Sequence, residues 1–211
     1  MYEYLVFDLD GTISDPKEGI VKSLNYALAT HGYEIREPKE IEKYIGPPLD
    51  YTFEVLTRVT DEAEIAKLVK SYRERYAEVG YSENLLYKGM KPVLASLAHN
   101  NGVKMGVCTS KRKDFAEKIL DLFQIHHLFA FVNGGDVGIQ KWRQIEALLD
   151  NGCISNNSVM IGDRSIDLAA AHKNGISSVG VLWGYGSRRE LSTEKPRHIF
   201  STPQQLAELI A

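Results

Sequence analysis

Two pairs of aspartates lie far apart in the sequence, each directly after an apolar run. Asp8 and Asp10 belong to the stretch Phe7-Asp8-Leu9-Asp10-Gly11-Thr12, which follows Leu5-Val6. Alternate side chains of a β-strand point the same way, so both carboxylates would project together. At the carboxyl end of a parallel strand they would lie where open α/β sheets bind ligands. Asp and Gly are also common turn formers, which is the structural alternative for this stretch alone.

The second pair, Asp163 and Asp167, follows the apolar run 159–161. A spacing of four places both carboxylates on one side of a starting helix. Helix capping would explain one of these aspartates, because acidic residues suit helix N-termini. Four carboxylates at one edge of a sheet repel one another unless a cation lies among them. Hard oxygen ligands at a phosphate site favour Mg2+, which is therefore the expected cofactor.

A phosphate group bound beside this cation would also need hydrogen-bond donors and positive charge. Thr109 and Ser110 end the second core strand, where a hydroxyl and the backbone N–H groups of a starting helix would form an anion site. Both residue types are also ordinary helix caps. Lys141 follows the third strand and a Gly-rich turn, and its ammonium group would neutralise a phosphoryl oxygen. Lys111 and Lys113 compete for this role, and the sequence does not separate the three lysines.

Apolar runs that alternate with helical patterns predict the elements that position these residues. Each run is apolar on consecutive residues, which is typical of strands covered on both faces in a parallel sheet. The alternating order predicts an α/β fold with a doubly wound, Rossmann-like parallel sheet. We expect strands at 5–7, 105–108, 130–132, 159–161 and 179–182, and helices at 91–100, 115–123, 142–150 and 165–174.

A mostly helical block interrupts this alternation after the first strand. Ile20, Leu24 and Leu28 lie on one helical stripe, and a second stripe follows between residues 65 and 72. Gly46-Pro47-Pro48 breaks the pattern between the two stripes. We therefore predict an α/β core formed by residues 1–13 and 87–211, and an α-helical cap domain inserted at residues 14–86.

Composition and charge narrow the class of protein. The 211 residues include 25 basic and 28 acidic side chains, and a formal net charge of −3 gives no electrostatic reason to expect nucleic acid. No run approaches the roughly 20 apolar residues of a membrane helix, and the first apolar stretch is too short for a signal peptide. Cys108 and Cys153 have neither metal-ligand spacing nor a disulfide framework. We expect a soluble cytoplasmic protein without nucleic-acid or membrane partners.

The combined motifs resemble the haloacid dehalogenase superfamily, and within it the phosphoglycolate-phosphatase-like members with a helical cap. Asp8–Thr12 is similar to the first family motif, Thr109 to the second, Lys141 to the third and Gly162–Asp167 to the fourth. The pattern DxDGT followed by GDxxxD is a specific combination, and the resemblance covers essentially the whole chain. In many relatives a proline follows the lysine of the third motif, whereas Trp142 follows it here.

The resemblance implies a Mg2+-dependent phosphatase that acts on a small phosphorylated metabolite such as phosphoglycolate, a nucleotide or a sugar phosphate. Asp8 would attack phosphorus to form an aspartyl-phosphate. Asp10 would protonate the leaving oxygen and then activate water. The implied metal ligands are Asp8, Asp10 through its backbone carbonyl, Asp163, and Asp167 directly or through a water. The expected contacts with substrate are Thr12, Thr109, Ser110, Lys141 and, from the cap, Gly46.

Other functions are compatible with parts of this pattern. A haloalkanoate dehalogenase would share the nucleophile but would need neither Asp10 nor a metal cluster. A sugar phosphomutase would use much the same core, including Asp10. A non-enzymatic phospho-acceptor or binding protein would share the acidic cluster, but receiver domains of that kind are shorter and lack the helical insert. The expected assembly is a monomer or homodimer, and the core motifs do not define the substrate.

Overall fold

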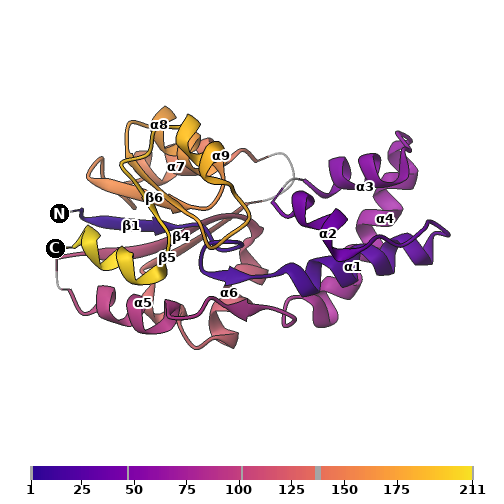
Figure 1. Ribbon diagram of the computed structural model, residues 1–211, viewed down its shortest axis with the longest axis horizontal. Coiled ribbons are helices and arrows are strands. Elements are labelled where there is room, and N and C mark those ends of the chain that lie inside the picture. Colours follow the sequence, from indigo (N-terminus) through magenta and orange to yellow (C-terminus); the bar gives the residue numbers. More distant parts are fainter. Residues whose placement is uncertain (1, 47, 101, 136–138, 211) are drawn as a thin grey trace. The chain divides into compact units, whose positions relative to one another are not determined.

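The computed structural model describes residues 2–46, 48–100, 102–135 and 139–210 (Figure 1). The chain divides into two compact units. We call Met1–Asp15 with Leu86–Ala211 the core unit, and Pro16–Leu85 the helical unit. Pro47 of the Gly-Pro-Pro break, and residues 136–138 of the Gly-rich turn before Lys141, lie outside the described residues.

A six-stranded parallel sheet in the order β5-β4-β1-β6-β7-β8 lies at the centre of the core unit. The central strand β1 pairs with β4 on one side and with β6 on the other, with Tyr4 opposite Lys104 and Ser158. The strands are β1 (Tyr4–Phe7), β4 (Lys104–Arg112), β5 (Phe131–Gly135), β6 (Ser158–Gly162), β7 (Ser177–Val181) and β8 (His198–Phe200).

Helices cover both faces of this sheet. Figure 1 shows α7 and α8 over one face and α5 and α6 over the other. The chain winds outward from β1 in both directions, so the carboxyl ends of β1 and its neighbours form the topological switch point at which such sheets bind ligands. The helices are α5 (Met90–Ala98), α6 (Lys113–Leu122), α7 (Lys141–Asp150), α8 (Ser165–Lys173) and α9 (Arg188–Thr193), with 3-10 helices at His126–Leu128 and Pro203–Leu209.

The predicted α/β fold class with a doubly wound parallel sheet is confirmed. Each predicted strand coincides with a strand of the sheet, whereas β8 was missed because His198–Phe200 is too short to give a clear apolar run. One local prediction is wrong: β4 continues to Arg112, which pairs with Gly135, and α6 begins only at Lys113. Ser110 therefore lies within a strand and not at the start of a helix.

The strands are apolar on consecutive residues because helices bury both of their faces. Leu5, Val6 and Phe7 are all fully buried. Val6 packs with Cys108 and Met160 in a cluster that helices α7 and α8 complete, so Cys108 is a buried core residue. Complete burial of an aliphatic or aromatic side chain is worth about 1.5–3 kcal/mol, and this core holds the ends of the strands in fixed positions.

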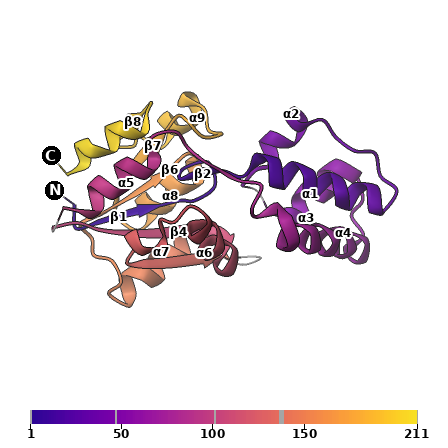
Figure 2. The same cartoon turned by 90° about the horizontal axis from the view of Figure 1, so that it is seen from below.

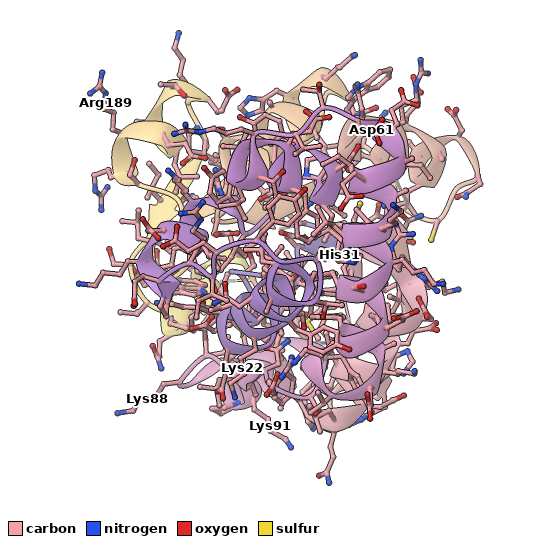
Figure 3. All side chains as sticks on the ribbon, turned by 90° about the vertical axis from the view of Figure 1, so that its right-hand side faces the viewer. Lys22, His31, Asp61, Lys88, Lys91 and Arg189 are labelled. Carbon is pink, nitrogen blue, oxygen red and sulfur yellow. The ribbon has the colours of Figure 1, made fainter. Side chains whose placement is uncertain are left out.

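The helical unit consists mainly of short helices that pack on one another. Helix α1 packs against α4 and against the π-helical turn that follows α4. A Cβ atom at Gly19 would lie 2.0 Å from the carbonyl oxygen of Gly80 in that turn, which explains the glycine at this contact. Asp61 caps α4 by accepting a hydrogen bond from the Glu64 amide at 2.9 Å (Figure 3). The helices are α1 (Lys17–Thr30), α2 (Pro38–Ile41), α3 (Leu49–Thr57) and α4 (Glu62–Arg75), with a 3-10 turn at Glu42–Tyr44 and a π-helical turn at Tyr76–Gly80.

Charged side chains also pair within this unit. Glu83 accepts hydrogen bonds from Arg75 at 2.9 and 3.1 Å and from Lys22 at 2.9 Å. The Arg75 guanidinium, which also donates to the Ser23 hydroxyl at 3.0 Å, lowers the pKa of the Glu83 carboxyl from its ordinary value. Arg75 therefore stabilises the helical unit internally.

The chain passes between the two units twice. The first passage includes β2 (Ser14–Asp15) and the second includes β3 (Leu85–Leu86), and these short strands pair with each other (Figure 2). The sequence analysis placed the domain divisions after residues 13 and 86, and the compact units divide after Asp15 and Leu85. In the described part of the chain, no helix has both the length and the apolar character that a membrane span requires.

Candidate active site

Asp8 and Asp10 lie in the turn that follows β1. The Asp8 amide still donates to the carbonyl oxygen of Ile161 in β6 at 2.9 Å, so the neighbouring strand holds the backbone of this residue. The chain then turns at Gly11, whose φ of +86° favours glycine. A Cβ atom at Gly11 would also lie 2.3 Å from Asp163 Oδ2, so this position has no room for a side chain.

Asp163 and Asp167 follow β6 and are both completely buried. Asp163 precedes helix α8, and Asp167 lies in its first turn. Asp167 accepts a hydrogen bond from the Arg164 amide at 3.1 Å, so the capping interpretation is correct for this residue. A Cβ atom at Gly162 would lie 2.3 Å from Asp167 Oδ2, which explains why glycine precedes the pair.

Three of the four aspartates converge. Asp8, Asp163 and Asp167 each offer one carboxylate oxygen, and these atoms lie within 4.8 Å of one another. Asp8 Oδ1 is buried, and no described donor makes a hydrogen bond of good geometry to it. The Asp10 carboxylate instead forms an ion pair with Lys111, with 2.9 Å between Nζ and Oδ2. The three buried carboxylates could therefore hold a metal ion, and the side chain of Asp10 has a different environment.

Lys141 is the lysine that meets the acidic cluster. It is the first residue of α7 and is 2% exposed. Its ammonium group lies 2.9 Å from Asp8 Oδ1 and donates a hydrogen bond to Asp167 Oδ1. Lys113, by contrast, has a side chain that is 62% exposed and faces Glu117 at 3.7 Å. The three candidate lysines thus have distinct surroundings, and Lys141 contacts the proposed nucleophile.

The remaining residues expected to bind substrate occupy different positions. Thr109 is buried in β4, where Gln144 donates to its carbonyl oxygen at 3.0 Å. Ser110 is exposed on the same strand. The Thr12 hydroxyl donates to Asp163 Oδ1 at 3.3 Å, so in this structure it orients a carboxylate. Gly46 belongs to the helical unit and has a φ of +107°, a conformation that favours glycine.

The pKa values of Asp163, Asp167 and Lys141 are shifted because several carboxylates are buried close together. Burial, together with the nearby carboxylates of Asp167 and Asp8, raises the pKa of Asp163 to about 8. Burial likewise raises the pKa of Asp167 to about 6, although the Lys141 ammonium opposes this change. Burial would lower the pKa of Lys141, but its two carboxylate neighbours outweigh that effect and raise it. A bound cation would relieve the repulsion among these carboxylates.

In the metal-free protein, we expect Asp163 to make the free energy of unfolding fall as the pH rises. Between pH 3.8, its ordinary pKa, and about pH 8, the folded protein binds more protons at Asp163 than the unfolded chain does. The resulting loss of stability is absent at the acidic end of this pH range and reaches its full size above the upper end. Urea denaturation in EDTA at about pH 5.5 and about pH 8 measures the change.

The matched control is Asp163→Asn, which cannot ionise. We expect the loss of stability between the two pH values to be smaller in this variant than in the wild type. Added Mg2+ should restore stability to the wild type at the higher pH, because a ligand that binds the folded state stabilises it. An identical pH dependence in both proteins would contradict the assignment of a raised pKa to Asp163.

The sequence analysis missed residues that contact the aspartates of the site without belonging to the acidic cluster. Lys111 was only one of three competing lysines, and nothing in the sequence pairs it with Asp10. The loop Trp183–Gly186 follows β7 and also contacts the site. In the structure, the Tyr185 amide donates to Asp163 Oδ2 at 2.8 Å. The glycines on either side of Tyr185 were the available signal, because they permit close backbone contact.

The chain is similar to a known protein family, to individual relatives and to solved structures. A family model described as haloacid dehalogenase-like hydrolase matches residues 5–181. A 5'-nucleotidase from Pseudomonas aeruginosa is 37% identical over 201 residues, which cover 93% of this chain and 90% of the relative. The tyrosine-protein kinase PtkA of Mycobacterium tuberculosis is 34% identical over 188 residues, which cover 87% of this chain but 63% of the relative. The crystal structure of a candidate phosphatase from Clostridium difficile has a TM-score of 0.90 and 37% identity, with coverage of 100% of this chain and 99% of that one.

Proposed function

Because this chain belongs to the haloacid dehalogenase-like hydrolase family, we propose that it is a Mg2+-dependent phosphatase that hydrolyses a small phosphomonoester through a phosphorylated aspartate. The observation that carries this proposal is the buried cluster of Asp8, Asp163 and Asp167 with the ammonium group of Lys141 beside it. Buried carboxylates and the ammonium group of Lys141 lie at the switch point of a parallel sheet. This arrangement suits a reaction in which a dianionic phosphoryl group is bound and transferred.

The donor set of the cluster fits Mg2+. Mg2+ prefers hard oxygen ligands and is usually held in proteins by a small number of carboxylates. Asp8 and Asp163 would hold it, with the backbone carbonyl of Asp10 and, directly or through a water, Asp167. The convergence of the three carboxylate oxygens and the raised pKa of Asp163 both support a cation here. When bound, Mg2+ would neutralise part of the charge on the phosphoryl oxygens.

Asp8 is the proposed nucleophile. Its carboxylate attacks phosphorus, the bond between phosphorus and the leaving oxygen breaks, and an acyl phosphate remains on Asp8. The backbone of Asp8 is fixed by its hydrogen bond to Ile161, and Lys141 lies 2.9 Å from its carboxylate. Lys141 would also bind a phosphoryl oxygen, so that the same cation stabilises the charge that moves during the displacement.

Asp10 is the proposed general acid and base. It donates its proton to the leaving oxygen in the first step and takes a proton from the attacking water in the second. Burial raises the pKa of the Asp10 carboxyl above its ordinary value, although the neighbouring Lys111 ammonium opposes the shift. A carboxyl group with a raised pKa is better suited to carry the proton that the leaving group needs.

The remaining assignments concern substrate. Thr109 and Ser110 would bind the phosphoryl group, and Thr12 would act through Asp163, which its hydroxyl contacts. The helical unit would serve as the cap that selects the substrate and excludes water, with Gly46 facing the substrate. The nucleotidase relative makes nucleoside monophosphates the first class to examine, followed by phosphoglycolate and sugar phosphates.

Phosphate release from a panel of these phosphomonoesters tests the proposal. The wild type should release phosphate with Mg2+ and not with EDTA. Release that does not depend on metal would contradict the proposal. Isomerisation of a sugar phosphate without phosphate release would instead support a phosphomutase.

A further inference from the structure

The loop Trp183–Gly186, which follows β7, lies directly against Asp163. A Cβ atom at Gly184 would lie 2.5 Å from Asp163 Oδ2, and one at Gly186 would lie 1.8 Å from the Asp163 carbonyl oxygen. Between them, the Tyr185 amide donates to Asp163 Oδ2 at 2.8 Å. The loop thus closes around one carboxylate of the proposed metal site, and its backbone fixes the direction of that carboxylate.

The side chain of Tyr185 reaches a different feature of the core unit. Its hydroxyl donates a hydrogen bond to Asp15 Oδ1, and Asp15 is the last core residue before the helical unit begins. Tyr185 also shares a hydrogen bond with Tyr87, which lies just after the chain returns to the core unit. A single residue therefore contacts the core ends of both linkers and, through its amide, Asp163.

A second set of contacts with Asp163 involves Trp183, which lies two residues before Tyr185 in the same loop. The Trp183 indole donates to the Thr12 carbonyl oxygen at 2.8 Å. The Thr12 hydroxyl donates in turn to the other carboxylate oxygen of Asp163, Oδ1, at 3.3 Å. Both oxygens of Asp163 are thus oriented by groups that the loop holds in place.

We infer that Tyr185 is a positioning residue that couples the two linker ends, at Asp15 and Tyr87, to the proposed metal ligand Asp163. This inference rests on the proposed function, because it assigns Mg2+ binding to Asp163. A coupling of this kind is reciprocal: if the position of the linkers alters the affinity for Mg2+, then bound Mg2+ must restrain the linkers to the same extent. Both directions can be measured without any substrate.

The first test measures the Mg2+ affinity of the full-length protein by calorimetry. Tyr185→Phe removes the hydroxyl that contacts Asp15 and keeps the ring and the amide that contacts Asp163. We expect its dissociation constant for Mg2+ to rise by about 5-fold or more. Asp15→Ala should have a similar effect and should add little when combined with Tyr185→Phe. Asp15→Asn, which keeps an acceptor oxygen, should bind Mg2+ nearly as well as the wild type.

The second test measures the reciprocal effect by amide hydrogen exchange. The amides of Ser14 and Tyr87 are hydrogen-bonded to the carbonyl oxygens of Leu9 and Ile13, so their exchange reports on opening of the linker ends. We expect Mg2+ to slow their exchange in the wild type and to have a smaller effect in Tyr185→Phe. Tyr4→Phe, which removes a tyrosine hydroxyl from β1, is the matched control and should behave as the wild type does in both tests.

The outcomes separate this inference from the function on which it rests. If the wild type binds Mg2+ and Tyr185→Phe binds it equally well, with equal protection of the linker amides, the coupling is overturned and the proposed function stands. If the wild type does not bind Mg2+, the proposed function fails, and the inference fails with it. A weaker affinity in Tyr4→Phe equal to that in Tyr185→Phe would also overturn the coupling, because the effect would not be specific to the contact with Asp15.

Discussion

Replacement of Asp8 by asparagine is expected to lower kcat by at least about 10^4-fold, because the amide cannot attack phosphorus. The fold should be retained. Asp8 lies in the turn after β1 and is held by its backbone hydrogen bond to Ile161, which the substitution does not change. The change also removes one negative charge from a buried group of three carboxylates, so the melting temperature in EDTA should not fall. Steady-state kinetics and thermal denaturation measure the two effects.

The control for this variant is Asp114→Asn, which removes a carboxylate from the surface of α6, where it pairs with Arg112. It should leave kcat within about twofold of the wild type, because exposed ion pairs contribute little. Near-normal turnover by Asp8→Asn, with the same substrate specificity as the wild type, would exclude Asp8 as the nucleophile. Loss of activity together with loss of the cooperative thermal transition would show instead that Asp8 is needed for folding.

Replacement of Lys141 by methionine is expected to reduce the free energy of unfolding by about 3–5 kcal/mol in EDTA near pH 8, and to abolish turnover. Lys141 is 2% exposed and faces Asp8 and Asp167. Without the ammonium group, two buried carboxylates lose their compensating charge. Burying uncompensated carboxylates costs more free energy than losing a surface ion pair. Urea denaturation monitored by circular dichroism measures the loss.

Two further variants check the physical cause. Lys113→Met removes a lysine whose side chain is 62% exposed, and it should change the free energy of unfolding by about 1 kcal/mol or less. Adding Asp167→Asn to Lys141→Met removes one of the two uncompensated charges and should recover part of the lost stability. If Lys141→Met were as stable as Lys113→Met, the account of Lys141 as the compensating cation of the cluster would be wrong.

Much of the fold follows from the sequence because buried parallel strands have a strong signal. Leu5–Phe7 and Val159–Ile161 are apolar on consecutive residues, and both are central strands covered on two faces. The edge strand β8 was missed since it has three residues. The end of β4 was misplaced because Ser110 and Lys111 have the polar character of a loop, while their backbone still continues the strand towards Arg112, which pairs with β5.

The site was predictable where spacing determines geometry. The aspartates that follow β1 and those that follow β6 lie at the same end of the sheet because these strands are neighbours. The sequence could not tell which carboxylates share one location, since that depends on side-chain direction: Asp10 pairs with Lys111, and the other three converge. Residue types and spacing alone did not select Lys141 among the three lysines, although the family resemblance did, and they did not reveal the contact between Tyr185 and Asp15. Both choices depend on contacts between distant segments.

Detection of a phosphoryl group on Asp8 tests the central claim most directly. An activated aryl phosphate such as p-nitrophenyl phosphate speeds the first step through its good leaving group but leaves the second step unchanged, so the phosphorylated enzyme accumulates. We predict a burst of nitrophenolate that requires Mg2+. Mass spectrometry of the acid-quenched protein should then place the phosphoryl group on Asp8, and Asp8→Asn should show neither the burst nor the modification. A burst without a phosphoryl group on Asp8, or with the group on another residue, would contradict the account.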